Sequence, residues 1–208
     1  FGAAVHINSI SGADGFAPTN AKQVLVSDIN RHVIAFGCTP VEQTLANSGN
    51  GEIDPLLIRF SDGNDPTIWN PDFSNSAGDI LLASGNEIVS AVHTRQETLV
   101  FTDASLYSMQ NIGPPLIFVA APISGQTTIM GPNSAVAVDG VVFWMGKENF
   151  YLYSGSVQKI DCTVRSKVFN DFNFRQSAKV FASVNSTYNE VWWFYPSASS
   201  ENNDRYVV

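Results

Sequence analysis

The first candidate for chemistry is an acidic run in the middle of the first half of the chain. Asp62-Gly63-Asn64-Asp65 brings several oxygen ligands close together, which is the first requirement of a calcium loop. Such a loop needs about six to eight oxygens at regular spacing, and this run lacks the glutamate that completes an EF-hand. Because Asp, Gly and Asn favour turns, a structural turn is the simpler interpretation. We therefore predict a turn and no metal site here.

Paired carboxylates are a second candidate, because two acids flanking a glycosidic bond form the machinery of most glycoside hydrolases. Glu52 with Asp54, or Asp54 with Asp72, would form such a pair if folding brought them together. Nothing in the sequence indicates that it does, so we interpret all three as solvated acids of loops. A sialidase-like or depolymerase site would also need clustered arginines, whereas the arginines here are spread along the chain. They are Arg31, Arg59, Arg95, Arg165, Arg175 and Arg205.

The histidines and cysteines form no recognisable catalytic or metal-binding pattern. His6, His32 and His93 are scattered, and no Gly-x-Ser-x-Gly elbow accompanies them. Cys38 and Cys162 lack the spacing of a zinc site. We expect two free thiols in a reducing compartment, with a disulfide as the alternative. The sequence thus predicts no enzyme activity, no catalytic residues, no cofactor-binding residues and no metal.

The densest aromatic run is Trp192-Trp193-Phe194-Tyr195. In a strand, Trp192 and Phe194 face one way, and Trp193 and Tyr195 face the other. Stacking on sugars or bases is one use of such a run. Packing between adjacent sheets is the simpler use, and we predict it here.

The composition points to a folded protein with much of its surface against other protein. Apolar residues make up 44% of the 208 residues, whereas charged residues make up only 14%, below the roughly 25% typical of globular proteins. The net charge of −8 argues against binding nucleic acid by neutralising its phosphates. The same charge is compatible with a protein surface that DNA passes without binding to it.

No apolar run approaches the ~20 residues that a membrane helix needs, so we expect no membrane insertion. No signal peptide is visible. The chain begins with Phe1 and ends at Val208 within an expected strand, so we expect it to be part of a longer polypeptide.

The elements that would position these residues are β-meanders, which recur four times. The clearest copy is Ile88–Val92, Thr98–Thr102 and Ser105–Met109, three short runs separated by turn residues. The other copies are Gln23–Asp28, His32–Gly37 and Pro55–Phe60; Ala135–Asp139, Val141–Met145 and Phe150–Tyr153; and Ala178–Val184, Val191–Tyr195 and Arg205–Val208. Repetition at a period of tens of residues is typical of propellers, solenoids and arrays.

The spacing of the copies favours a propeller of four-stranded blades. The step between the middle strands at Phe101 and Trp144 matches a blade of about 40–45 residues. The longer step from Phe36 is explained by insertions at 38–54 and 61–77, and Asp79–Ala83 would supply an outer edge strand. We therefore predict an all-β fold of propeller-like blades, each a four-stranded antiparallel meander, which would form a partial propeller.

The expected organisation is a lead-in segment followed by one domain. Residues 1–22 are rich in small and polar residues and indicate a loop or lead-in, and residues 23–208 form a β-propeller domain of about four blade-like units. One short helix is predicted at 163–173. Its apolar residues fall on a single helical face. They are Val164, Val168, Phe169 and Phe172.

Several words of the sequence, taken in order, resemble one protein family. They are Pro55–Asp62, Trp69-Asn70-Pro71, Ala77-Gly78, Thr98–Met109, Val141–Gly146 followed by Phe150–Tyr153, Glu190–Pro196 and Asp204–Val208. Together they resemble the β-propeller tail proteins of short-tailed bacteriophages. This group includes the tail nozzle, also called tubular tail protein B, and the packaged-DNA stabilisation proteins.

The resemblance implies a structural component of the virion. Members of this family form homohexameric rings below the portal and adaptor, and DNA passes through the ring without sequence-specific binding. The resemblance therefore implies partners in other tail proteins, a place in the phage tail, and assembly in the host bacterial cytoplasm. It carries over no catalytic residues. Nozzle proteins are several times longer than this chain.

A second function remains open on the residues alone. The aromatic content and long polar tips such as Ser197–Asn203 would also suit a receptor- or glycan-binding β-propeller of a phage tail. Glycan arrays and adsorption assays discriminate this alternative from a DNA conduit.

Overall fold

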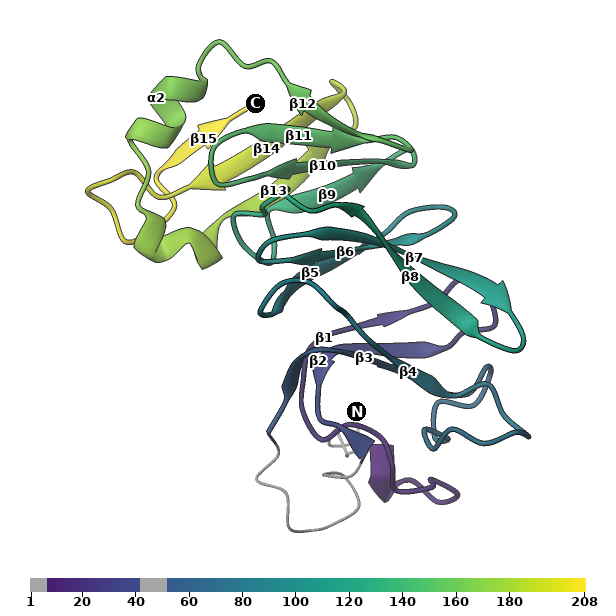
Figure 1. The fold of residues 1–208 in the computed structure, drawn as a ribbon. Coiled ribbons are helices and arrows are strands. Elements are labelled where there is room, and N and C mark those ends of the chain that lie inside the picture. Colours follow the sequence, from purple (N-terminus) through teal and green to yellow (C-terminus); the bar gives the residue numbers. More distant parts are fainter. Residues whose placement is uncertain (1–6, 42–51) are drawn as a thin grey trace. The chain divides into compact units, whose positions relative to one another are not determined.

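The computed structural model describes residues 7–41 and 52–208, and their regular structure is almost entirely β (Figure 1). Four antiparallel sheets follow one another along the chain, and in each sheet the neighbouring strands are also consecutive in sequence. The chain is therefore all-β and consists of four propeller-type blades, which confirms the predicted fold class. It divides into two compact units, which we call unit 1 (Phe1–Ile88 and Met109–Ala120) and unit 2 (Val89–Ser108 and Ala121–Val208).

The first blade lies in unit 1. Its strands, in spatial order, are β1 (Ala21–Val26), β2 (Val33–Cys38), β3 (Asp54–Phe60) and β4 (Gly78–Leu81). The turn between β1 and β2 places Asn30 and Arg31 in the left-handed backbone region, with φ of 58° and 53°. Phe36 and Ile58 pair across β2 and β3, and both are fully buried.

The opposite face of the first blade is covered by the segment that precedes it. A short 3₁₀ helix, η1 (Ile7–Ser9), begins this segment, and Ala17 is buried with Leu57 and Trp69. Arg59 lies in the same layer and is also buried: its Nη1 donates to the Thr39 carbonyl (3.0 Å) and its Nη2 to that of Phe16 (2.6 Å). Residues expected only to lead into the domain thus pack on its first sheet.

The second and third blades have four strands each. They are β5 (Ile88–His93), β6 (Thr98–Thr102), β7 (Leu106–Gly113) and β8 (Ile117–Ser124); and β9 (Ala135–Val138), β10 (Val141–Met145), β11 (Phe150–Tyr153) and β12 (Val157–Ile160). Within unit 2 the two blades share one apolar cluster, in which the ring centroids of Phe101 and Trp144 are 5.2 Å apart. Asp139 and Gly140 form the turn between β9 and β10, with φ of 51° and 86°.

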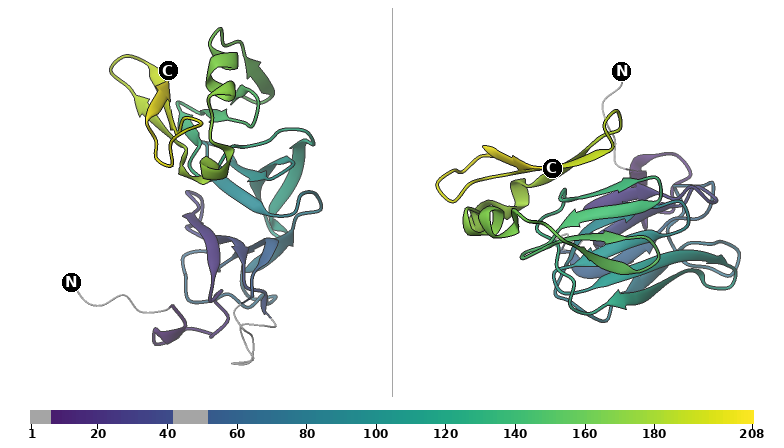
Figure 2. Two further views of the ribbon diagram at one scale, coloured as in Figure 1. Left: turned by 90° about the vertical axis from the view of Figure 1, so that its left-hand side faces the viewer. Right: turned by 90° about the horizontal axis from the view of Figure 1, so that it is seen from above.

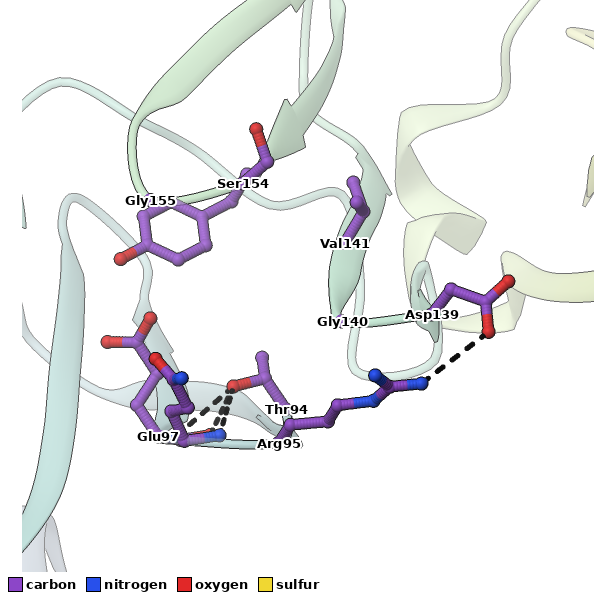
Figure 3. A pocket seen from close by; sticks show the side chains of 10 residues that line it. Thr94, Arg95, Glu97, Asp139, Gly140, Val141, Ser154 and Gly155 are labelled. Atoms are coloured by element: carbon purple, nitrogen blue, oxygen red, sulfur yellow. Dashed lines mark hydrogen bonds and ion pairs between the residues drawn. The ribbon is translucent and has the colours of Figure 1, made fainter.

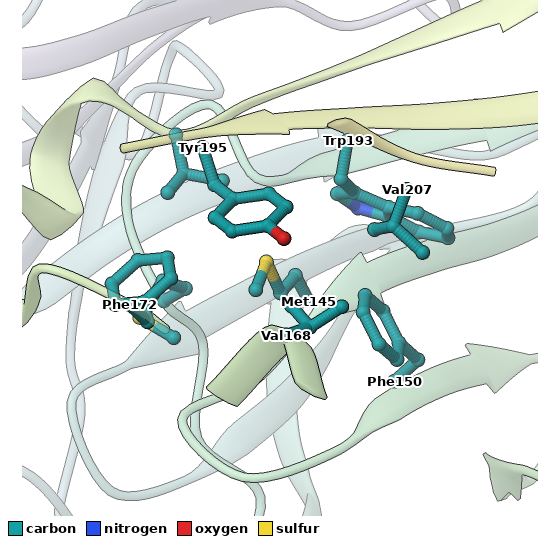
Figure 4. Close-up of a cluster of buried hydrophobic side chains, with 9 residues drawn as sticks. Met145, Phe150, Val168, Phe172, Trp193, Tyr195 and Val207 are labelled. Atoms are coloured by element: carbon teal, nitrogen blue, oxygen red, sulfur yellow. The ribbon is translucent and has the colours of Figure 1, made fainter. Parts of the chain in front are cut away.

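The fourth blade has three strands in the described part of the chain: β13 (Phe181–Asn185), β14 (Glu190–Tyr195) and β15 (Arg205–Val207). It is preceded by α2 (Arg165–Asn170) and the 3₁₀ segment η2 (Phe174–Lys179). The right-hand view of Figure 2 shows α2 on one side of this sheet. The cluster between the third and fourth blades includes Met145, Phe150, Val168, Trp193 and Tyr195 (Figure 4).

Several sequence-based predictions differ from the structure, and three of the differences have a local explanation. The helix is shorter than predicted, and Val164 is exposed because it occupies the N-cap position rather than the buried face, whereas Val168 and Phe172 are buried. The strand expected from Ala178 begins at Phe181, because η2 occupies the preceding residues. Strand β12 was not predicted, since its sequence Val-Gln-Lys-Ile carries only two apolar residues.

Candidate functional site

A polar pocket of about 410 Å³ lies within unit 2 at the hairpin ends of two blades (Figure 3). The turn that links β5 and β6 contributes Arg95 and Gln96, and the third blade contributes Asp139, Tyr153 and Ser154. Tight turns at adjacent hairpin ends put these polar side chains side by side. The pocket is open to solvent, so its exposed groups stay hydrated.

Glu97 is the charged group that the pocket holds most firmly. Its carboxylate accepts a hydrogen bond from the Ser108 hydroxyl. Burial, together with the hydrogen bond to Glu97 and its negative charge, raises the pKa of Tyr153 to about 12. The neutral Tyr153 phenol donates to Glu97, and this contact links the second and third blades.

The remaining charged pair of the pocket is loose. Arg95 Nη2 lies 3.9 Å from Asp139 Oδ1, and both side chains are largely exposed. Exposed pairs of this kind contribute about 0–1 kcal/mol. Both groups are therefore available to a polar ligand, because breaking their ion pair costs little free energy.

A second candidate surface is the face of the fourth blade that points away from the third. Phe181, Trp192, Phe194 and Tyr206 stand together on this face, which we call the open aromatic face. The ring centroids of Phe181 and Phe194 are 4.7 Å apart, and those of Trp192 and Tyr206 are 4.9 Å apart. Phe181 is 42% exposed and Tyr206 is 61% exposed, so this is an apolar surface in contact with water.

The aromatic run of β14 is thus divided between two environments. Trp193 and Tyr195 are buried between sheets, which confirms the packing prediction for this half of the run. Trp192 and Phe194 lie on the open aromatic face, where no sheet of the described unit 2 covers them fully. The alternation was visible in the sequence. The partners Phe181 and Tyr206 were not, because they are brought in by strand register.

The acidic run at the first candidate site forms the predicted turn. Asp62 and Asp65 make a β-bridge, and the Asp62 carboxylate accepts from the Ser76 backbone (2.7 Å) and hydroxyl (2.6 Å). Burial opposes the charged form of Asp62, but the hydrogen bonds from Ser76 and Gly63 outweigh it and lower the pKa. Asp65 in turn accepts from Thr67. Both carboxylates therefore serve the local backbone.

The acids considered as catalytic pairs also bind their own loops. Asp54 Oδ1 accepts from the Leu56 backbone (3.0 Å), and Asp72 Oδ1 accepts from the backbone of Ser74 (3.0 Å). Glu52 is exposed. These contacts are those of turn-forming acids. Across residues 7–41 and 52–208, no group of three or more His, Cys, Asp or Glu side chains is arranged to hold a metal ion.

The histidines and cysteines of the described residues are hydrogen-bonded or at least partly buried. His32 is buried, its Nε2 lies 3.0 Å from the Ser76 hydroxyl, and burial lowers its pKa. His93 Nδ1 lies 3.0 Å from Thr98 Oγ1, and His6 lies outside the described residues. Cys38 and Cys162 are free thiols, as predicted, and burial raises the pKa of Cys38 to about 12.

A larger depression of about 640 Å³ lies in unit 1. It is lined by the 71–77 loop together with Pro114, Pro115 and Ile117, and the Phe73 side chain on its rim is fully exposed. Its polar side chains bond within the 61–77 loop itself: Asp72 accepts from Ser74, and Ser76 donates to Asp62.

Comparisons with protein-family models and with curated protein sequences find no match to this chain. Among the helices of the described residues, none has the length and apolarity to cross a membrane.

Proposed function

We propose that this chain is a structural, non-enzymatic component of a bacteriophage tail of the nozzle or tubular type. The main support for this proposal is the position in the fold of the motifs that resemble the phage tail family. Thr98–Met109 covers β6 and the start of β7, Val141–Tyr153 covers β10 and β11, and Glu190–Pro196 covers β14. Most of the resembling motifs therefore lie on strands of the blades, where proteins that share a fold are expected to share residues.

The surface of the chain supports a role in assembly. Only 14% of the residues are charged, and the fourth blade presents four stacked aromatic rings to water. Exposed apolar patches of this kind mark protein–protein contacts. We propose that the chain functions within an oligomer, as a ring that contacts the adaptor and other tail proteins in the virion.

The charge supports a conduit rather than a DNA-binding role. A net charge of −8 repels the phosphate backbone, so DNA would pass such a wall without being retained. In this proposal the chain lines or supports the channel through which the genome leaves.

Electron microscopy of particles labelled with an antibody against this chain tests the function. We expect label at the short tail and, in averaged images, a ring with a central hole. Label confined to peripheral appendages, or a chain that is absent from particles, would contradict the proposal.

The polar pocket favours glycan binding as a second candidate. The pocket of about 410 Å³ is lined by Arg95, Gln96 and Asp139. A ligand would have to break only the weak, exposed ion pair between Arg95 and Asp139. If the chain binds receptor glycans there, an array should show binding that Arg95→Ala abolishes. A matched change at an exposed arginine that does not line this pocket, Arg31→Ala in unit 1, should leave the binding intact. Binding that survives Arg95→Ala, or no binding at all, would remove this candidate.

A further inference from the structure

One buried histidine contacts both segments that line the depression in unit 1. His32 is only 1% exposed. Its Nε2 lies 3.0 Å from the hydroxyl of Ser76, a residue of the 71–77 loop that lines the depression. Its ring also packs edge-on against Phe118, with the centroids 5.1 Å apart, and Phe118 directly follows Ile117 of the other lining segment. The two segments are thus joined through a single imidazole.

The hydrogen bonds around Ser76 fix the protonation state of this imidazole. The Ser76 hydroxyl donates to Asp62 Oδ1 (2.6 Å), because a charged acceptor makes the shorter and stronger bond. The Ser76 oxygen accepts from the Gly63 backbone (2.9 Å). Since a hydroxyl has a single hydrogen, His32 must donate to Ser76 from Nε2. The neutral ring therefore leaves Nδ1 as an acceptor, and this atom is buried without a hydrogen-bond partner in the described part of the chain.

The surroundings of the ring disfavour a second proton. Phe60 and Phe118 pack edge-on against it, with centroids 6.2 Å and 5.1 Å away, and neither side chain can accept a hydrogen bond from a charged Nδ1–H. The Ile29 carbonyl and the negative charge of the Asp62 carboxylate favour protonation. Burial outweighs both and lowers the pKa of His32 from its ordinary value of 6.5. The ring is therefore neutral while the two lining segments are joined.

We propose that protonation of His32 releases the 71–77 loop from the start of β8 and so opens the depression of unit 1 between about pH 7 and pH 5. The charged ring leaves its apolar site, which breaks the contacts with Ser76 and Phe118 together. Because the pKa of His32 is depressed, the neutral ring stabilises the closed form fully above pH 6.5 and progressively less below it. Asp62 stays charged in this range, since its own pKa is lowered from 3.8. This pH response is independent of the proposed tail function.

NMR spectroscopy of the whole chain tests the proposal. The ring resonances of His32 should titrate with a midpoint below pH 6.5, and the contacts between the His32 and Phe118 rings should weaken over the same range. The Ser76 backbone N–H, which donates to Asp62 (2.7 Å), reports on the loop. Its protection from hydrogen exchange, corrected for the intrinsic effect of pH, should fall at least about fivefold between pH 7 and pH 5. The amides of β10 in unit 2 should keep their protection.

Two variants separate His32 from other acid-sensitive groups. His32→Gln offers a donor to Ser76 but takes up no second proton, so its Ser76 amide should stay protected at both pH values. His93→Gln, at a histidine 3.0 Å from Thr98 Oγ1 in unit 2, should keep the wild-type response.

The proposal is overturned if His32 titrates at or above pH 6.5, or if Ser76 stays protected while His32 is protonated. Equal loss of protection in His32→Gln overturns it, as does simultaneous loss in β10, which would indicate global unfolding. If His32→Gln does not fold, the titration and exchange of the wild-type chain decide the question.

Discussion

The two faces of strand β14 carry similar residues but lie in different surroundings. Trp193 and Tyr195 are closed in by the third blade, whereas Trp192 and Phe194 lie against one another and against water. A single strand of Trp and aromatic residues thus contributes both a core and a surface. An aromatic run in a strand therefore indicates packing between sheets only for the residues on the face that a neighbouring sheet covers.

The largest effect is expected on the covered face. Trp193→Ala should lower the free energy of unfolding by about 3–5 kcal/mol, because it opens a cavity in the cluster between the third and fourth blades. It also leaves the Ser134 carbonyl without the donor at Trp193 Nε1, which lies 3.0 Å away. Urea denaturation measures this loss. Trp144→Ala, at a fully buried ring between the second and third blades, should cost as much.

A change of less than about 1 kcal/mol at Trp193 would mean that the two faces of β14 do not differ in burial. A similarly small loss of unfolding free energy in Trp144→Ala would mean that Trp144 is not in the core, and that the middle strands of the blades are wrongly matched to one another.

The covered face of the first blade extends the comparison to a buried charge. Arg59→Met keeps the aliphatic volume but leaves the carbonyls of Phe16 and Thr39 without their donor. We expect a loss of about 2–4 kcal/mol, since carbonyls buried without a partner are costly. Arg95→Met, at an exposed ion pair, should change stability by about 1 kcal/mol or less. Equal effects in chemical denaturation would show that Arg59 does not hold the lead-in segment on the sheet.

A smaller effect is expected on the open aromatic face. Trp192→Ala removes ring contacts with Phe194 and Tyr206 but leaves no enclosed cavity. We expect a loss of about 0.5–1.5 kcal/mol, the contribution of such stacking. The measurement is made at low protein concentration, so that self-association does not add to it. A loss as large as that of Trp193→Ala would contradict an open face.

A pH-dependent effect is expected at the Tyr153–Glu97 contact between the second and third blades. Because the pKa of Tyr153 is raised from 10.0 to about 12, the neutral phenol is favoured in the folded state. Its contribution to stability is present below about pH 10 and is lost as the pH rises toward 12. The unfolding free energy of the wild type should therefore fall more steeply over this range than that of Tyr153→Phe. Parallel curves would show that Tyr153 ionises as freely as in the unfolded chain.

The local pattern of apolar runs between turn residues was sufficient to predict most strands. Thr98–Thr102, Val141–Met145 and Phe150–Tyr153 are the bounds of β6, β10 and β11, because turn residues flank each apolar run. β12 was missed because its pairing with β11, rather than its composition, makes it a strand. The Glu97–Tyr153 contact was missed for a related reason, since its two residues come from different blades and no local pattern links them.

The proposed role as part of a DNA channel can be tested by electron cryomicroscopy of a short phage tail that contains this chain. If the chain has this role, we expect density for its meanders in a ring around the DNA channel, with the open aromatic face of each copy covered by a β-sheet. Density for the chain on a peripheral appendage, with Trp192 and Tyr206 facing solvent or sugar, would contradict it.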